Sequence, residues 1–169
     1  MARTRILGID PGSRLTGYGI VESDGRRSVH VRNGCIRAGS GPLPERLGII
    51  YREVEAIVAD YRPGELAVEA VFVARNAASA LKLGHARGAA ICAGVHHGLP
   101  VSEYSARVVK QALVGSGAAD KRQVRHMVAR LLSVDDDLQE DAADALAVAL
   151  CHAHTRSTLG RYHIAGSRR

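Results

Sequence analysis

The chain has 169 residues, of which 46% are apolar and 4% aromatic, and it carries a formal net charge of +6. These values suit one globular domain with an aliphatic core and make a second independent domain unnecessary. No run approaches the roughly 18 apolar residues that span a bilayer, and the first residues do not form a signal peptide. We therefore expect a cytoplasmic protein with no membrane segment.

The cysteines and histidines follow no metal-binding pattern. Cys35, Cys92 and Cys151 are odd in number and far apart, which argues against disulfides and a zinc site. We expect the cysteines to be small buried residues and assign the histidines no catalytic role.

The positive charge is concentrated in one part of the chain. Residues 75–130 hold nine basic residues and two acids, whereas residues 131–144 hold six acids and no Lys or Arg. A basic region beside a compact acidic cluster is typical of a protein that holds a polyanion and brings cations to it. The alternative is that these charges lie on solvated helix faces.

The first expected strand is the apolar run Ile6–Ile9. It ends at Asp10, because the following Pro11 and Gly12 cannot continue a hydrogen-bonded ladder. Asp10 therefore lies at the rim of a sheet, either as a functional carboxylate or only as the first residue of a turn.

The remaining elements predict a mixed sheet. A hairpin turn at Asp24-Gly25 and other short connections make the first three strands antiparallel, while a helix before the fourth strand makes it parallel to the first. The expected strands are 17–21, 28–36, 66–72 and 100–103, and the expected helices are 44–60, 76–96, 105–113, 121–132 and 140–154. We predict one α/β domain over residues 1–154, with five strands flanked by helices, and a basic, disordered tail over residues 155–169.

Three further carboxylates stand out. Glu69 lies within an apolar strand, where a charged side chain needs a partner, and this partner could be a metal ion or simply a salt bridge. Asp141 and Asp144 are spaced i, i+3 and share one face of a helix, where they could bind a cation or merely favour the positive end of the helix dipole.

Together, Asp10, Glu69, Asp141 and Asp144 come from three distant segments that can meet at one edge of the sheet. Carboxylate oxygens are ligands that suit Mg²⁺ or Mn²⁺. Two such ions about 3.5–4 Å apart can activate a water and stabilise the leaving oxygen of a phosphodiester. The set therefore predicts metal-dependent phosphodiester hydrolysis.

A stripe of small residues follows one face of the helix expected over residues 76–96. Ala80, Gly84, Gly88 and Cys92 recur at intervals of four, which allows close approach of another backbone. That backbone could belong to the chain's own sheet or to a second subunit.

Several motifs occur in a fixed order: Ile9-Asp10-Pro11-Gly12-Ser13 with Thr16-Gly17-Tyr18-Gly19, Val68-Glu69-Ala70-Val71-Phe72, NAASALKLGHARG at 76–88 and DAADALA at 141–147. Together they resemble RuvC, a family of bacterial crossover-junction endonucleases, and the likeness extends from about Arg5 to His154. The resemblance implies a ribonuclease-H-like fold and a homodimer that nicks a four-way Holliday junction symmetrically with Mg²⁺. It further implies two ions per subunit, 5′-phosphate and 3′-hydroxyl products, roles in recombination and repair, and the RuvA-RuvB branch-migration complex as a partner.

The resemblance also assigns residues. It makes Asp10, Glu69, Asp141 and Asp144 the four catalytic, metal-binding carboxylates. It places Lys110 and Lys121 beside the DNA near the metals, and Phe72 against bases at the crossover, although Phe72 could instead be a core residue. Arg75 and Lys82, from the basic region, are further DNA-binding candidates. With this resemblance, the small-residue stripe favours a dimer interface.

Three other functions fit parts of the sequence. Actin-like kinases and ATPases open with a similar Asp-Gly loop, but they close nucleotide between two such domains, and this chain has length for one. An architectural junction-binding protein would leave the acids unused. A shorter relative of the same fold implicated in RNA processing would cut structured RNA instead.

Overall fold

The computed structural model describes residues 3–70, 76–135 and 137–166, with side chains described as far as Arg156. Five strands and five helices follow one another in this part of the chain. They are β1 (Thr4–Asp10), β2 (Leu15–Ser23), β3 (Ser28–Arg37), α1 (Leu43–Tyr61), β4 (Glu65–Ala70), α2 (Ala77–His96), β5 (Val101–Ser105), α3 (Ala106–Val114), α4 (Lys121–Leu132) and α5 (Glu140–Gly166).

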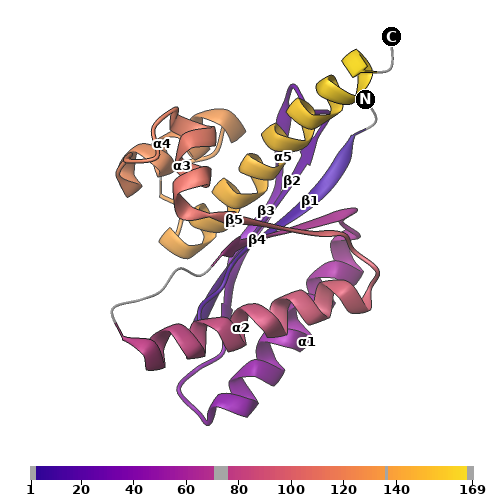
Figure 1. The fold of residues 1–169 in the computed structure, drawn as a ribbon. Helices are drawn as coiled ribbons and strands as arrows, with labels where there is room; N and C mark the ends of the chain where they lie inside the picture. The colour runs from indigo at the N-terminus through magenta and orange to yellow at the C-terminus, as the bar shows by residue number, and fades with distance from the viewer. Residues whose placement is uncertain (1–2, 71–75, 136, 167–169) are drawn as a thin grey trace.

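The strands form one mixed sheet in the order β3-β2-β1-β4-β5 (Figure 1). β1, β2 and β3 pair antiparallel, and β4 and β5 run parallel to β1. This confirms the predicted five-stranded α/β fold. The expected fourth strand included two residues, Val71 and Phe72, that lie outside the described residues.

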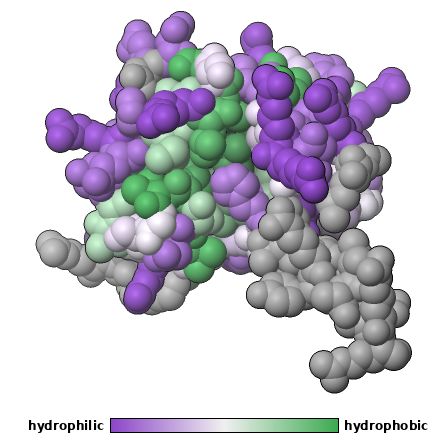
Figure 2. Space-filling view, turned by 90° about the horizontal axis from the view of Figure 1, so that it is seen from above, coloured by the Kyte–Doolittle hydropathy of each residue, from purple (hydrophilic) through white to green (hydrophobic). Residues whose placement is uncertain are grey.

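Helices cover both faces of the sheet, with α1 and α2 on one side and α3, α4 and α5 on the other (Figure 1). Side chains alternate between two apolar clusters: Ile6 packs toward α3–α5, whereas Leu7 and Ile9 pack toward α1 and α2. No helix in the described part of the chain is long and apolar enough to cross a membrane. At the end where both termini lie, an apolar band separates polar side chains (Figure 2).

Glycines let α5 lie directly on the sheet. A Cβ atom on Gly17 would lie 1.9 Å from the carbonyl oxygen of Asp141, and one on Gly8 would lie 2.1 Å from that of Ala145. On the neighbouring strands, Gly8 of β1 pairs with Gly19 of β2, and Gly17 pairs with Asp10. Because real side-chain atoms cannot approach so closely, glycine at these positions sets where α5 begins above the strand ends.

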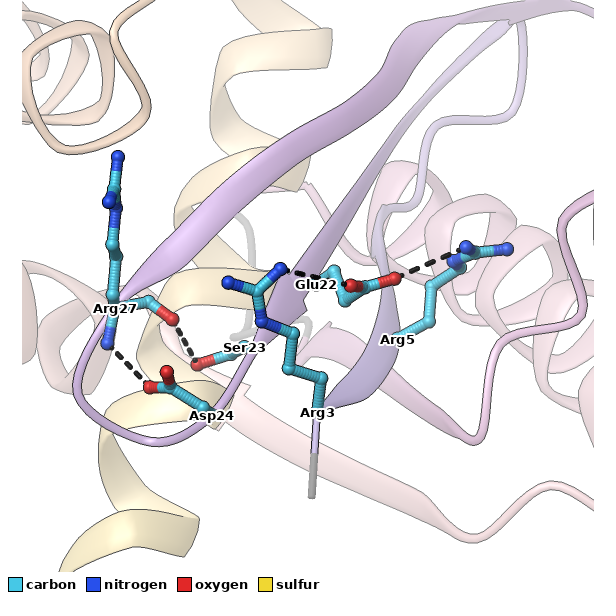
Figure 3. Close-up of polar contacts among 6 residues, drawn as sticks. All are labelled: Arg3, Arg5, Glu22, Ser23, Asp24 and Arg27. Carbon is cyan, nitrogen blue, oxygen red and sulfur yellow. Dashed lines mark hydrogen bonds and ion pairs between the residues drawn. The ribbon is translucent and has the colours of Figure 1, made fainter. Parts of the chain in front are cut away.

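The expected Asp24-Gly25 pair lies in the β2–β3 turn, where Asp24 faces Arg27 (Figure 3). Asp24 Oδ1 accepts hydrogen bonds from the backbone nitrogens of Arg26 and Arg27, each 2.8 Å long, and Gly25 has a φ of 86°. Beside the turn, Glu22 forms an ion pair with Arg5 at 3.2 Å. The turn contacts close the β2–β3 hairpin, and the ion pair links β2 to β1.

The last helix differs from the prediction. We expected it to end at His154, but α5 continues to Gly166. One contact with the sheet lies past the expected end, since Arg156 pairs with Glu65 at 2.9 Å. His152 Nε2, within the expected helix, lies 2.5 Å from the same carboxylate. Residues 155–166 contain no proline that would interrupt the helix.

The cysteines also differ in part. Cys151 is buried as expected, but Cys35 is half-buried and Cys92 is exposed. α2 buries Ala86, Ala90 and Ala93, and therefore turns Cys92 outward.

Candidate active site

The carboxyl ends of two neighbouring parallel strands bring Asp10 and Glu69 together. β1 and β4 are in register at Ile9 and Val68, so the next residue of each strand is one of these acids. Both line the same two cavities. The prediction that Asp10 lies at the rim of the sheet is confirmed.

The first turns of α5 supply the other acids. Asp144 lines the smaller cavity with Asp10 and Glu69. Asp141 is absent from the described lining of both cavities, but its charge raises the pKa of both Asp10 and Asp144. The structure thus gathers three of the four predicted carboxylates around one cavity and places the fourth beside them.

The smaller cavity has a volume of about 250 Å³ and contains both predicted lysines. Lys110 comes from α3, and Lys121 is the first residue of α4, whose start is fixed by a capping box between Asp120 and Gln123. Lys121 Nζ lies 3.5 Å from Asp144 Oδ2 and 2.5 Å from Glu140 Oε1. The hydrogen bond with Glu140 and the charge of Asp144 raise the pKa of Lys121, so it stays cationic.

The larger cavity has a volume of about 530 Å³ and shares Asp10, Glu69 and Ala106 with the smaller one. The two cavities therefore adjoin, with the acids between them. Its other described lining residues are Pro11, Ala70, Leu83, Ser105 and Arg107.

Burial and mutual repulsion raise the pKa values of the carboxyl groups in the site. Burial, the charge of Glu69 and a hydrogen bond with Glu69 raise the pKa of Asp10 to about 8. Burial is also the largest cause of the raised pKa of Glu69 and of Asp144. In the metal-free site, burial and mutual repulsion thus make it costly for Asp10 and Glu69 to be charged at the same time.

The donor set fits a hard divalent cation, because it consists of partly buried carboxylates whose charges repel one another. In the described residues, however, no three Asp, Glu, His or Cys side chains are gathered closely enough to hold a metal ion as they stand. The acids share a site, and small side-chain rotations would be needed for common ligation.

The other predicted DNA-binding residues are not among the described residues that line the two cavities. Lys82 is exposed on α2 and is not among the described residues that line these cavities. Phe72 and Arg75 lie outside the described residues.

Sequence reasoning missed the residues that fix the loop after Asp10. Arg46 is 8% exposed and donates hydrogen bonds to Ser13 O at 2.8 Å and Ser13 Oγ at 3.3 Å. Thr16, fully buried, donates to Gly12 O at 2.7 Å. The position of Arg46 on the apolar stripe of α1, four residues before buried Ile50, was the signal that could have identified it.

The small-residue stripe faces away from the chain's own sheet. A Cβ atom on Gly84 or Gly88 would meet no atom of the described residues within 4 Å, whereas one on Gly94 would meet Leu66 of β4. Leu81 and Val95, on the same helix, are 65% and 57% exposed. Packing against the chain's own sheet, one of the two sequence-based alternatives, is therefore wrong.

Known proteins resemble the whole chain. The family model described as crossover junction endodeoxyribonuclease RuvC matches residues 6–152. Curated relatives of that name include those of Pseudomonas fluorescens, 58% identical over 92% of this chain and 90% of the relative, and Pseudomonas aeruginosa, 55% identical over 98% and 95%.

Solved structures agree. Thermus thermophilus RuvC in complex with a Holliday junction substrate matches with a TM-score of 0.87 and 35% identity, over 92% of this chain and 96% of that one. The yeast mitochondrial Holliday junction resolvase matches with a TM-score of 0.69 and 11% identity, over 94% and 83%, and so shares the fold. The sheet with its acidic strand ends, the family model and the close relatives agree, and the chain belongs to the crossover junction endodeoxyribonuclease family RuvC.

Proposed function

We propose that this chain is an endonuclease that resolves four-way DNA junctions by paired, symmetric nicks. The observation that carries the proposal is the smaller cavity, in which Asp10, Glu69 and Asp144 face Lys110 and Lys121. Acids that can hold cations lie there beside lysines that can hold a phosphate. The Thermus relative bound to a Holliday junction substrate supports junction DNA as the ligand.

Asp10, Glu69, Asp141 and Asp144 would hold two Mg²⁺ ions per subunit, with Mn²⁺ as a substitute. When bound, the ions would supply an activated water and charge stabilisation at the leaving 3′-oxygen, giving 5′-phosphate and 3′-hydroxyl ends. Asp10 and Glu69 line both cavities, and burial together with the charge of Glu69 raises the pKa of Asp10 to about 8, so Asp10 would be a metal ligand at the centre of the site.

The lysines orient the strand to be cut. Lys110 is half-buried in the cavity wall, and a compact ammonium there acts as a point charge for a phosphate. Lys121 is held between Glu140 and Asp144, so its position depends on the acid cluster it serves. Phe72 would stack on a base at the crossover, and Arg75 and Lys82 would contact more distant backbone.

We further propose a homodimer formed through the outward stripe of α2, because symmetric nicks require two sites related by a two-fold axis. The exposed Leu81 and Val95 extend the stripe with apolar surface. As in the family, the partners would be junction DNA and the RuvA-RuvB branch-migration complex, and the bacterial relatives support action in the cytoplasm, in recombination and repair.

Gly88→Leu is expected to make the protein monomeric in analytical ultracentrifugation, because a leucine would hold the two α2 backbones apart. Its fold should survive, since the position faces open space in one subunit. Arg52→Ala on α1 serves as the control and should remain dimeric. A Gly88→Leu protein that sediments as a dimer would contradict the interface.

Asp144→Asn is expected to retain junction affinity within about twofold while lowering the cleavage rate by roughly 10²-fold or more, because it removes a metal ligand and no phosphate contact. Gel-shift binding in EDTA and cleavage in Mg²⁺ measure the two effects separately. Normal cleavage by this variant would favour an architectural protein whose acids are unused.

Substrate choice tests the remaining alternatives. A four-way DNA junction should be nicked in preference to structured RNA and linear duplex. Efficient cutting of RNA alone would favour the RNA-processing relative, and nucleotide-dependent thermal stabilisation with ATP would favour the kinase-like alternative.

A further inference from the structure

The larger cavity contains a cationic side chain, Arg107, that has no role in the proposed reaction. Arg107 belongs to the first turn of α3 and lines this cavity together with Asp10 and Glu69. Of these two cavities, Lys110 and Lys121 line the smaller and not the larger. Arg107 is therefore the cationic side chain among the described residues of the larger cavity.

Arg107 has no carboxylate partner among the described residues. Lys121, in contrast, pairs with Glu140 and Asp144. An exposed guanidinium beside an acidic site, with no acid to bind it, is available for an anion from outside.

The chain holds the stem of Arg107 in place. A Cβ atom on Gly117 would lie 2.7 Å from Arg107 Cγ, so the arginine packs directly over a position that has no side chain. Gln111 ties this loop to α3, since its Nε2 donates to Gly115 O at 2.8 Å and its Oε1 accepts from Gly117 N at 3.1 Å. The loop thus limits the directions that the Arg107 side chain can take.

The spacing on α3 suits one nucleic-acid strand. Arg107 and Lys110 are related i, i+3, which puts their Cβ atoms about 5–6 Å apart on the helix surface. One lines the larger cavity and the other the smaller, with Ala106 shared by both. A strand whose reacting phosphate lies beside Lys110 would therefore carry its neighbouring backbone past Arg107.

We propose that Arg107 binds a DNA backbone phosphate in the larger cavity, next to the phosphate that is cut, and that Gly117 keeps its side chain there. This inference rests on the proposed function. Arg107 is a binding residue that positions the strand, while the acids and lysines of the smaller cavity act on the reacting phosphate.

The test is the salt dependence of binding to a four-way DNA junction in EDTA. Arg107→Ala should weaken binding roughly tenfold and reduce the slope of log K against log salt by about 0.9 for each protomer that binds, because one counterion fewer is released. Arg107→Lys should keep the slope. The matched control, Arg52→Ala on the opposite helical layer, should change neither value. An unchanged slope in Arg107→Ala, or an equal change in Arg52→Ala, would overturn the proposal.

Gly117→Ala tests the positioning by the loop. Alone, it should weaken junction binding, because the new methyl displaces Arg107. Combined with Arg107→Ala, it should have no further effect. If Gly117→Ala weakens junction binding equally in wild type and in Arg107→Ala, Gly117 acts independently of Arg107, and its proposed role in positioning Arg107 is overturned. If wild type cuts the junction but the Arg107 slope is unchanged, this inference alone fails. A wild type that does not cut would instead remove the proposed function.

Discussion

Replacing Asp10 by Asn is expected to lower the rate of junction cleavage by roughly 10³-fold or more and, at the same time, to stabilise the metal-free fold. Both effects arise from one side chain. Asp10 lines both cavities, as Glu69 does, and its carboxyl group is buried against Glu69.

The stability gain follows from the direction of the pKa shift. The pKa of Asp10 rises from 3.8 to about 8 on folding, so the folded state binds a proton more tightly than the unfolded chain. The stabilisation from this proton is complete below about pH 4 and is lost as the pH rises to about 8. Asparagine carries no charge, so the variant should be more stable at pH 8 in EDTA, by on the order of 1–3 kcal/mol.

Urea unfolding of both proteins between pH 4 and pH 8 in EDTA measures this. Wild type should lose stability across that window, and Asp10→Asn should lose less. Asp24→Asn in the β2–β3 turn is the control: hydrogen bonds from Arg27 and Arg26 lower the pKa of Asp24, so its contribution is already complete above about pH 4, and this variant should be less stable than wild type by the same amount across the window. If the free energy of unfolding changes with pH in the same way for wild type and Asp10→Asn, the raised pKa of Asp10 is contradicted.

Gly17→Ala is expected to destabilise the protein by about 3 kcal/mol or more and to reduce cleavage of the remaining folded protein. The added methyl would lie 1.9 Å from the carbonyl oxygen of Asp141, so α5 would have to move away from the sheet. This shift would carry Asp141 and Asp144 away from Asp10. Added Mg²⁺ should therefore stabilise the variant less than wild type.

The matched control is Gly41→Ala, in the loop before α1. A Cβ there would meet only the end of the Glu45 side chain, at 3.3 Å, and the residue is exposed. Its stability should change by no more than about 0.5 kcal/mol. Thermal and urea unfolding compare the two variants, and a Gly17→Ala protein as stable as Gly41→Ala would contradict the direct packing of α5 on β2.

Local signals were sufficient for much of the site. Pro11 and Gly12 ended the first strand at Asp10, and the connection through α1 made β4 parallel to β1, which placed Glu69 at the same edge. The i, i+3 spacing of Asp141 and Asp144 indicated a shared helix face. These inferences depend on neighbouring residues and on the order of strands and helices, and both are available from the sequence.

Other features depend on packing between distant segments. The extension of α5 relies on contacts between Glu65 and Arg156, which are far apart in sequence, and the outward position of Cys92 depends on which face of α2 meets the sheet. In the sequence, Arg107 is one of nine basic residues in the region 75–130 and has no feature that distinguishes it. The structure shows that it packs against Gly117 and lines a cavity with Asp10 and Glu69. Composition and periodicity contain no record of such contacts.

The most direct test of metal-dependent junction resolution is cleavage of a mobile four-way DNA junction by wild type with Mg²⁺, by wild type in EDTA, and by Asp10→Asn with Mg²⁺. We predict paired nicks at symmetric positions, with 5′-phosphate ends, in the first reaction alone. Cleavage in EDTA, or undiminished cleavage by Asp10→Asn, would contradict it.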